Sequence, residues 1–467
     1  MKLRKILSLL IAVVLCFGSI HITHAEEQPL LSAAVPQFQS AAPQANDWLD
    51  GIDRNTLIQE LRQKLFQLSA SIDISKYNIP NECITEFLTF MRDEIPEAFH
   101  VDYSDGVSYH SGAKYLVSVD PDYLYSKGVY EQKLAEINAV ARRMTADLKD
   151  LPQVKQALLI HDRLALACYY PDAPYSDHDF TMYGALISGR AVCQGYALAY
   201  KYLLNQVGIE NELCSSDILE HAWNIVTIDG RQYHVDVTWD DPWNIDGIVW
   251  HNNFLRSTAG IIETGHHADD FNSAPTDTTY DNAFWKDYDT AFVKLRGSEL
   301  YYIDLNKAAV CRYSDRQKVL ELGTMWPAEN GYYSGCYSIL AADGMNLLYS
   351  QYGTVYRFDP VTGIKEAVFT PSHTEPKTLN IYGLKLEGTT LRCTLSDVPY
   401  PIAETDFTRV ITTEYTLPLP FTTADAVTVM QYLIGMDVEL DLSIMDRDQD
   451  EIITISDAVL ILRALAA

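Results

Sequence analysis

Residues 221–239 have the sequence HAWNIVTIDGRQYHVDVTW, and this stretch decides what fold the middle of the chain adopts. Two β-prone runs flank Asp229-Gly230, a dipeptide typical of two-residue hairpin turns. The turn predicts that Ile228 pairs with Arg231, and the pairing continues back along both strands. We therefore expect an antiparallel hairpin.

The hairpin register brings His221 and Asp236 together. The two residues become diagonal neighbours on one face, about 7–8 Å apart at the backbone, which is within reach of a side-chain hydrogen bond. A carboxylate in that position fixes the imidazole tautomer and leaves the other ring nitrogen for a second partner. His234 shares the face and is a rival base, although it lies nearer the turn.

A cysteine lies about 30 residues upstream, in the segment GRAVCQGYA at 189–197. A helix that begins here places Cys193, Ala197 and Leu204 along one face and ends at Gly208. The positive end of a helix stabilises a thiolate at its first residue, and a thiolate attacks carbonyl carbon. The segment alone fits a buried structural cysteine equally well. In combination with the hairpin it predicts a Cys-His-Asp site.

These three segments, GRAVCQGYA, HAWN and YHVDVTWDDP at 233–242, closely resemble the bacterial transglutaminase-like domain. The sequences IHD at 160–162 and MYGAL at 182–186 resemble its upstream signature. The resemblance implies a papain-like core in which a helix with the cysteine packs on an antiparallel sheet. It further implies that Cys193 is the nucleophile, His221 the base and acid, and Asp236 the residue that orients His221.

The oxyanion partner does not follow from this resemblance. Papain-type enzymes have a glutamine six residues before the cysteine, where this chain has Ile187. The backbone amide of Cys193 is one candidate donor, and Tyr183 and Gln194 are weaker ones.

The chemistry implied is thiol attack on an amide, a thioester intermediate, and release to water or to an amine. The first hypothesis is thus an extracellular peptidase, amidase or acyltransferase acting on protein or peptide substrates, without a catalytic cofactor. The alternative is a catalytically silent binding or scaffold-associated protein that keeps the fold. Hydrolysis of cell-wall peptides is a weaker third hypothesis.

Composition bounds the partners. The chain has 467 residues, 63 acidic against 35 basic, and a formal net charge of −28. That charge disfavours nucleic acid and anionic membrane surfaces as partners. Residues 1–25 combine Lys2, Arg4 and Lys5 with a short apolar run and a Thr23-His24-Ala25 end, which predicts a signal peptide and a secreted protein with no membrane attachment after cleavage.

The number and spacing of the cysteines are consistent with an exported protein that keeps a free thiol. Of eight cysteines, Cys16 falls in the predicted signal peptide, which leaves seven scattered positions without a CxxC pair. This disfavours a structural zinc site and a dense disulfide framework. The odd number leaves at least one thiol unpaired, and Cys193 supplies a reason for it.

The C-terminal region predicts calcium. DRDQD at 446–450 places carboxylates at loop positions 1, 3 and 5, and these positions, the position 7 carbonyl and the position 12 carboxylate can surround one structural Ca²⁺. The proposed ligands are Asp446, Asp448, Asp450, the Ile452 carbonyl and Asp457. The segments DAVTVM at 425–430 and DAVLIL at 457–462 also repeat, which predicts two similar short helices.

This tail resembles a dockerin, the module that binds cohesins on bacterial scaffolds. Two departures weaken the likeness: Glu451 replaces the usual glycine at position 6, and the first repeat has Glu414, Thr416 and Pro418 where acids are needed. At most one calcium loop survives, so binding to a cohesin-bearing scaffold is left open.

The sequence therefore predicts an α+β protein with several domains. They are a signal peptide (1–25), a linker (26–46), a helical N-terminal region (47–150), a transglutaminase-like catalytic domain (151–275), a β-rich domain (285–415) and a small α-helical dockerin-like calcium module (418–467). In the β-rich domain, similar units recur every 40–50 residues. The domain has room for too few of these units to close a propeller, which favours an open meander or a sandwich.

Overall fold

The structure is a computed structural model. It describes residues 31–33, 47–103, 107–242, 247–267, 270–271, 273–295, 297–322, 338–351, 353–371, 380–387, 389–396, 410–417, 423–440, 445 and 452–466. The predicted signal peptide and most of the linker lie outside the described residues. The fold is a mixed α+β arrangement of helices and several antiparallel sheets, as expected.

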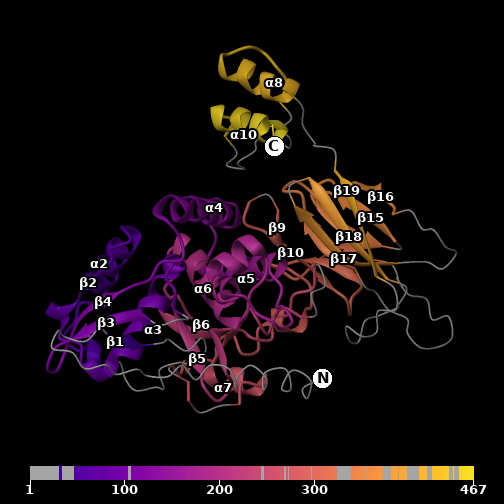
Figure 1. The fold of residues 1–467 in the computed structure, drawn as a ribbon. Coiled ribbons are helices and arrows are strands. Elements are labelled where there is room, and N and C mark those ends of the chain that lie inside the picture. Colours follow the sequence, from indigo (N-terminus) through magenta and orange to yellow (C-terminus); the bar gives the residue numbers. More distant parts are fainter. Residues whose placement is uncertain are drawn as a thin grey trace. The chain divides into compact units, whose positions relative to one another are not determined.

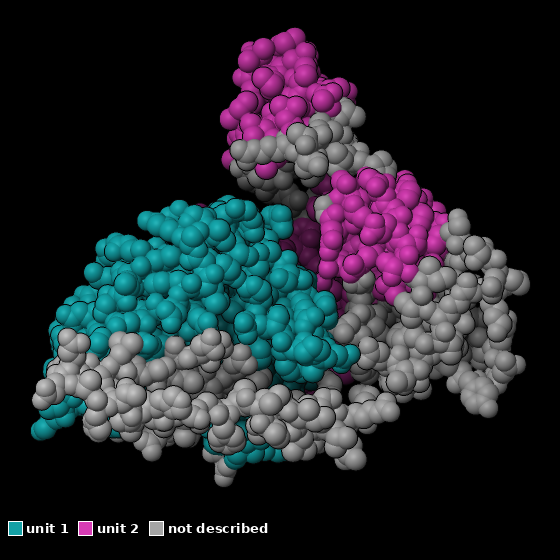
Figure 2. Space-filling model, in the orientation of Figure 1, with its two compact units in different colours: residues 1–146, 167–240, 252–283 teal, residues 147–166, 241–251, 284–467 magenta. Residues whose placement is uncertain are grey.

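The chain forms two compact units, coloured separately in Figure 2. The first contains residues 1–146, 167–240 and 252–283, and the second contains 147–166, 241–251 and 284–467. Neither unit is one continuous stretch of the chain. The segments 147–166 and 241–251 join the unit that carries the later strands.

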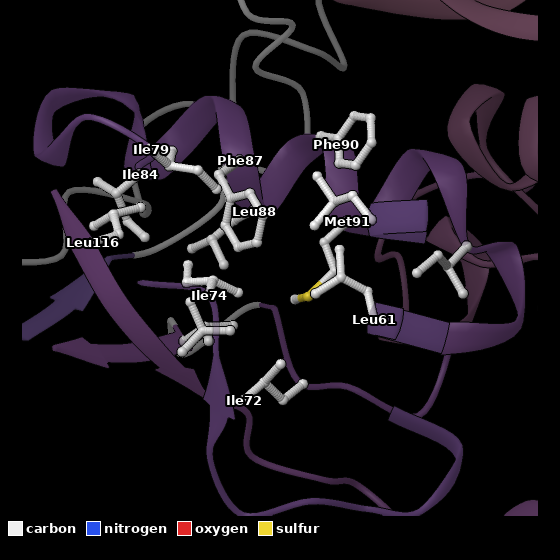
Figure 3. Close-up of a cluster of buried hydrophobic side chains, with 14 of the residues drawn as sticks. Leu61, Ile72, Ile74, Ile79, Ile84, Phe87, Leu88, Phe90, Met91 and Leu116 are labelled. Atoms are coloured by element: carbon white, nitrogen blue, oxygen red, sulfur yellow. The ribbon is translucent and has the colours of Figure 1, made fainter. Parts of the chain in front are cut away.

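The first unit begins with helices on a small sheet (Figure 1). The helices are α2 (Arg54–Phe66), α3 (Ile84–Glu94) and α4 (Lys127–Thr145), and the strands are β1 (Leu31–Ala33), β2 (Ile72–Asp73), β3 (Val107–Ser111) and β4 (Leu116–Asp120), in the order β1-β3-β4-β2. The predicted helical region therefore also contains a sheet. Its core joins Leu61 of α2 and Phe87 of α3 to Ile72 and Leu116 of the strands (Figure 3).

Helix α2 lies in the predicted helical N-terminal region and buries Leu57, Leu61 and Leu65. The helix ends at Phe66, and Leu68 just beyond it has a left-handed φ of 54°.

The central layer of the first unit is a helix on an antiparallel sheet. Helix α6 (Cys193–Gln206) packs against strands β5 (Asn211–Ser216) and β6 (His221–Ile228). The sheet continues with β7 (Arg231–Val235) and β8 (Phe254–Arg256), which α7 (Thr258–Glu263) covers. The predicted hairpin register is confirmed from Ile228–Arg231 to Asn224–Val235, and the pairing ends there, one residue before Asp236.

The second unit contains α5 (Gln153–Ala167), all but its last residue, and three consecutive β-meanders. Their strands are β9 (Val293–Lys294), β10 (Leu300–Asp304), β11 (Ala309–Arg312) and β12 (Lys318–Glu321); β13 (Leu340–Ala342), β14 (Leu347–Gln351), β15 (Thr354–Phe358) and β16 (Lys365–Phe369); and β17 (Asn380–Glu387), β18 (Thr390–Ser396) and β19 (Val410–Thr416). One apolar cluster joins the first meander to the second, and another joins the second to the third. The described strands thus form an open series of meanders.

The chain ends in two helices, α8 (Thr423–Leu433) and α10 (Ile455–Ala466), which pack on each other. Their core uses equivalent repeat positions, Ala426 with Ala458 and Val429 with Ile461. The two predicted repeat helices are therefore confirmed.

Short helical turns connect these elements. They are η2 (Asp47–Leu49), η3 (Ser75–Tyr77), η4 (Asn81–Cys83), η5 (Pro96–Ala98), η6 (Asp177–Phe180), the π-helical η7 (Gly184–Ser188) and η8 (Phe284–Asp287). Within the described part of the chain, no helix is both long and apolar enough to cross a bilayer.

Candidate active site

Cys193 is the first residue of α6, as the sequence predicts. Val192 caps the helix in an extended conformation, and the first intrahelical hydrogen bond runs from the Tyr196 amide to the Val192 carbonyl at 3.1 Å. The Cys193 amide thus precedes the first intrahelical donor, at the end of the helix that favours negative charge. The Cys193 thiol is free and 2% exposed.

An ion pair between buried Asp179 and half-buried Arg190 fixes the loop that precedes Cys193. The Asp179 carboxylate accepts hydrogen bonds from Arg190 Nη2 at 2.9 Å and from the Ser176 amide at 2.8 Å. The Asp179 carbonyl accepts the Val192 amide at 2.8 Å. These contacts tie the segment at 176–179 to residues 190–192, directly before the helix begins.

Gly195 allows α6 to approach this loop. A Cβ at residue 195 would lie 2.5 Å from the Asp179 carbonyl oxygen and 2.8 Å from the Ala191 Cβ. These contacts are too close for any side chain, so the glycine after Cys193-Gln194 is a packing requirement.

The hairpin places His221 against Asp236. His221 Nε2 lies 2.7 Å from Asp236 Oδ2, and both residues are buried. The other carboxylate oxygen, Oδ1, accepts the backbone amides of Thr238 at 3.0 Å and Trp239 at 3.3 Å. The carboxylate is therefore held from two sides, and it fixes the orientation of His221.

His221 also makes a side-chain hydrogen bond with Cys193. Since Nε2 is occupied by Asp236, this contact falls to Nδ1. The structure thus brings together all three residues that the sequence selected.

The charges of these groups depend on one another. Burial acts against the charged form of His221, but the charges of Asp236 and Cys193 and their hydrogen bonds outweigh it and raise the pKa of His221 to about 10. Burial likewise opposes charge on Asp236, yet the His221 charge and the hydrogen bonds from His221 and His266 hold the pKa of Asp236 below its usual value. The site therefore favours an imidazolium next to a carboxylate.

His234, the rival base, is engaged elsewhere. Trp223 Nε1 donates to His234 Nδ1 at 2.9 Å, and His234 Nε2 lies 3.0 Å from the Thr258 hydroxyl. Burial lowers the pKa of His234 to about 3. His234 is thus a neutral structural residue near physiological pH.

Sequence reasoning missed His266, a second histidine on Asp236. Its Nε2 lies 2.9 Å from Asp236 Oδ2, the same oxygen that His221 contacts. Trp239 covers the pair, with its ring centroid 4.0 Å from that of His266 and 5.3 Å from that of His221. His266 follows α7 in an irregular segment, where no periodic pattern marks it.

The two oxyanion candidates have different surroundings. Gln194 is buried and lines a small pocket with Phe99, His178 and Leu198. The Tyr183 ring stacks on Phe99 and lies 3.9 Å from Lys133 Nζ.

Two tyrosines of the first unit respond to the Cys193 charge. Tyr170 and Tyr175 share a side-chain hydrogen bond, and both interact electrostatically with Cys193. Burial raises the pKa of each phenol, so both remain protonated donors. The sequence offered no pattern that singled them out.

A second His-Asp-His cluster lies in the other unit. Asp162 Oδ1 lies 2.8 Å from His161 Nδ1 and 3.0 Å from His251 Nε2, while Oδ2 accepts the Phe292 amide. Its ligand atoms lie close enough to hold a metal ion. Their mutual hydrogen bonds already account for the Asp162 carboxylate, which is what a buried structural cluster requires.

Most of the predicted calcium ligands fall outside the described residues, namely Asp446, Asp448 and Asp450. Of the other two, Ile452 is exposed, and Asp457 is buried with Oδ2 accepting the Thr454 amide at 2.8 Å. Asp457 thus caps the start of α10.

Comparisons with known proteins found a limited likeness. No family model matches the chain, and no curated protein matches it. A solved structure described as "Crystal structure of a TGase" aligns at 12% identity with a TM-score of 0.22. The alignment covers 29% of this chain and 44% of that one, so this chain matches less than half of the other protein's length.

Proposed function

We propose that the first unit carries out thiol-dependent chemistry on amides of proteins or peptides. Cys193 acts as nucleophile, His221 as general base and acid, and Asp236 as the residue that orients His221. The observation that supports this assignment is the continuous chain of contacts from Cys193 through His221 to Asp236, with the 2.7 Å hydrogen bond at its end. A papain-like arrangement of α6 on its sheet is part of the same proposal.

The proposed reaction uses proton transfer between Cys193 and His221. His221 takes the Cys193 proton, and the thiolate sulfur attacks the amide carbonyl carbon. The C–N bond then breaks as the His221 imidazolium gives its proton to the leaving amine, which leaves a thioester on Cys193. Water or a second amine, deprotonated by His221, attacks the thioester and restores the thiol.

The oxyanion formed during attack needs donors. The Cys193 amide at the start of α6 is one, and Gln194 and Tyr183 remain candidates for the second. Tyr170 and Tyr175 join them because both interact with the Cys193 charge.

The alternative function is a silent binding module that keeps the fold without turnover. Iodoacetamide alkylation near neutral pH separates the two functions, because only an activated thiol reacts faster than an ordinary one. We expect rapid alkylation of Cys193 in the wild type and a slow reaction in His221→Ala. Equal, slow rates in both proteins contradict the enzyme proposal.

The acceptor is identified by incubating the protein with a peptide library, with and without an amine donor. Mass spectrometry then distinguishes hydrolysis, which adds water, from transfer, which adds the amine. Cys193→Ala is the control, and it must abolish either product.

We propose a second function for the last two helices. They dock the protein on a partner outside the cell, such as a cohesin. The observation that favours docking is the number of large apolar side chains that α8, α10 and their flanks leave exposed. They are Val427, Met430, Tyr432, Leu433, Ile434, Met436, Ile452, Ile455, Val459 and Leu462. Apolar surface concentrated on so small a module is typical of an interaction site.

A further inference from the structure

His266 and His221 compete for one carboxylate oxygen. Their Nε2 atoms lie 2.9 Å and 2.7 Å from Asp236 Oδ2. A carboxylate oxygen only accepts, so each Nε2 carries a proton in the state that the structure shows. Asp236 Oδ1 is already held by two backbone amides, which leaves Oδ2 as the oxygen that the two rings share.

The two rings differ at their other nitrogen. His221 has Cys193 as a partner, whereas the buried His266 Nδ1 makes no hydrogen bond within the described part of the chain. A buried N–H without an acceptor is costly, and a buried cation with such a group is costlier still. His266 is therefore neutral, with its proton on Nε2.

Aromatic and titratable side chains surround the neutral His266 ring. The ring contacts those of Trp239 and Trp223, with centroids 4.0 Å and 5.1 Å away. The titratable groups that face it are Asp236, His221 and His234. Gly265, with a φ of +118°, lets the backbone pass close to Trp239, because a Cβ there would lie 3.3 Å from that ring.

We propose that His266 is a positioning residue of the site, which binds the Asp236 oxygen next to His221 and limits how tightly the carboxylate holds the His221 proton. The hydrogen bond from His266 stabilises the charged carboxylate and so lowers its affinity for the His221 proton. His221 must release its proton to the leaving amine, so a carboxylate that binds it too tightly slows this step. The inference rests on the proposed function, but its test requires no turnover.

The test compares His266→Gln with His266→Met in the full chain. The two side chains have similar length and volume, but only glutamine carries an amide that donates to Oδ2. The titration of His221 is followed by NMR of selectively labelled histidine, assigned with His221→Gln. Cys193 alkylation against pH provides a second readout.

In His266→Met we expect the His221 midpoint to rise by about 0.5–1 pH unit, the shift that corresponds to losing one net hydrogen bond. In the pH profile of Cys193 alkylation, the limb at alkaline pH shifts to higher pH by the same amount. His266→Gln keeps the wild-type midpoint. A general disturbance of the fold would instead lower the midpoint and slow alkylation.

An unchanged or lower midpoint in folded His266→Met overturns the proposal, and so does the same shift in both variants. If His266→Met does not fold, nitrogen NMR of the wild-type histidines tests the proposal by itself. It must show His266 neutral and protonated at Nε2, and an imidazolium or the Nδ1–H form near neutral pH overturns the proposal. Absence of peptide turnover in the wild type contradicts only the proposed function.

Discussion

At the scale of single residues, the site depends on a buried carboxylate that raises the proton affinity of His221. Replacing Asp236 with asparagine removes the charge but keeps the shape. The pKa of His221 should then fall, because burial is no longer offset by the negative charge. We expect Cys193 alkylation at pH 7 to slow by about tenfold or more, since each pKa unit changes the charged population tenfold.

Asp162→Asn is the matched control for Asp236→Asn. It also removes the charge from a buried aspartate between two histidines, but the Asp162 carboxylate contacts His161 and His251 rather than the histidine next to Cys193. Loss of alkylation in both variants would show that general destabilisation, and not the Asp236 charge, explains the effect.

His221 also makes stability depend on pH. Its pKa in the folded state, about 10, lies above the value of about 6.5 in an unfolded chain. The folded state binds the proton more tightly, so the stabilisation is fully present below about pH 6.5 and is lost as pH rises through about 10. We expect the difference in free energy of unfolding between wild type and His221→Gln to shrink from about pH 6.5 to about pH 10. Chemical denaturation at several pH values measures it, and a difference that grows with pH contradicts the pKa shift.

The residue pattern revealed part of this site. Cys193, His221 and Asp236 stood out because a helix start and a hairpin turn fix their positions locally. His266 and Tyr170 did not, because they reach the site through irregular segments whose path depends on the whole unit. Local signals predict a contact only when both residues belong to one regular element or to one tight turn.

At the scale of elements, the approach of α6 to the Asp179 loop determines where Cys193 lies. Gly195→Ala should destabilise the first unit by about 1–3 kcal/mol, since the added methyl meets the Asp179 carbonyl. The change should also slow Cys193 alkylation, because α6 must move away from the loop. Thermal unfolding and alkylation rates measure the two effects.

Gly128→Ala is the control for this helix substitution. Gly128 lies in α4, and a methyl group added there would have no described atom of another element within 4 Å. Alanine at this position should therefore be neutral or stabilise by about 0.5–1 kcal/mol. Similar destabilisation by both changes would contradict the packing explanation for Gly195.

Elements with strong local signals were predictable, and short ones were not. The Asp229-Gly230 turn fixed the register of β6 and β7, and the segment at 189–197 indicated α6. Strands β1 to β4 of the first unit have two to five residues each, too few to show alternation. Ile72, Val107 and Leu116 of the later three strands pack with α2 and α3, and periodicity does not reveal such packing.

At the scale of the whole molecule, the chain combines a candidate catalytic unit with a C-terminal repeat. The two repeat helices use equivalent positions in their shared core. Only the second is preceded by an acidic loop. The repeat thus allows one half to serve as a control for the other.

We propose that this loop binds one Ca²⁺ through Asp446, Asp448, Asp450, the Ile452 carbonyl and Asp457, and that the ion stabilises the repeat. Asp457 also caps α10, so its replacement would remove the helix cap together with the calcium ligand. Asp446→Ala tests the ion alone. Calorimetry of the full chain should show one binding site in the wild type and none in Asp446→Ala. Asp425→Ala, at the equivalent of Asp457 in the first repeat, should keep that site. Equal calcium binding by wild type and Asp446→Ala refutes the ligand assignment, because a hard cation held by so few carboxylates depends on each of them.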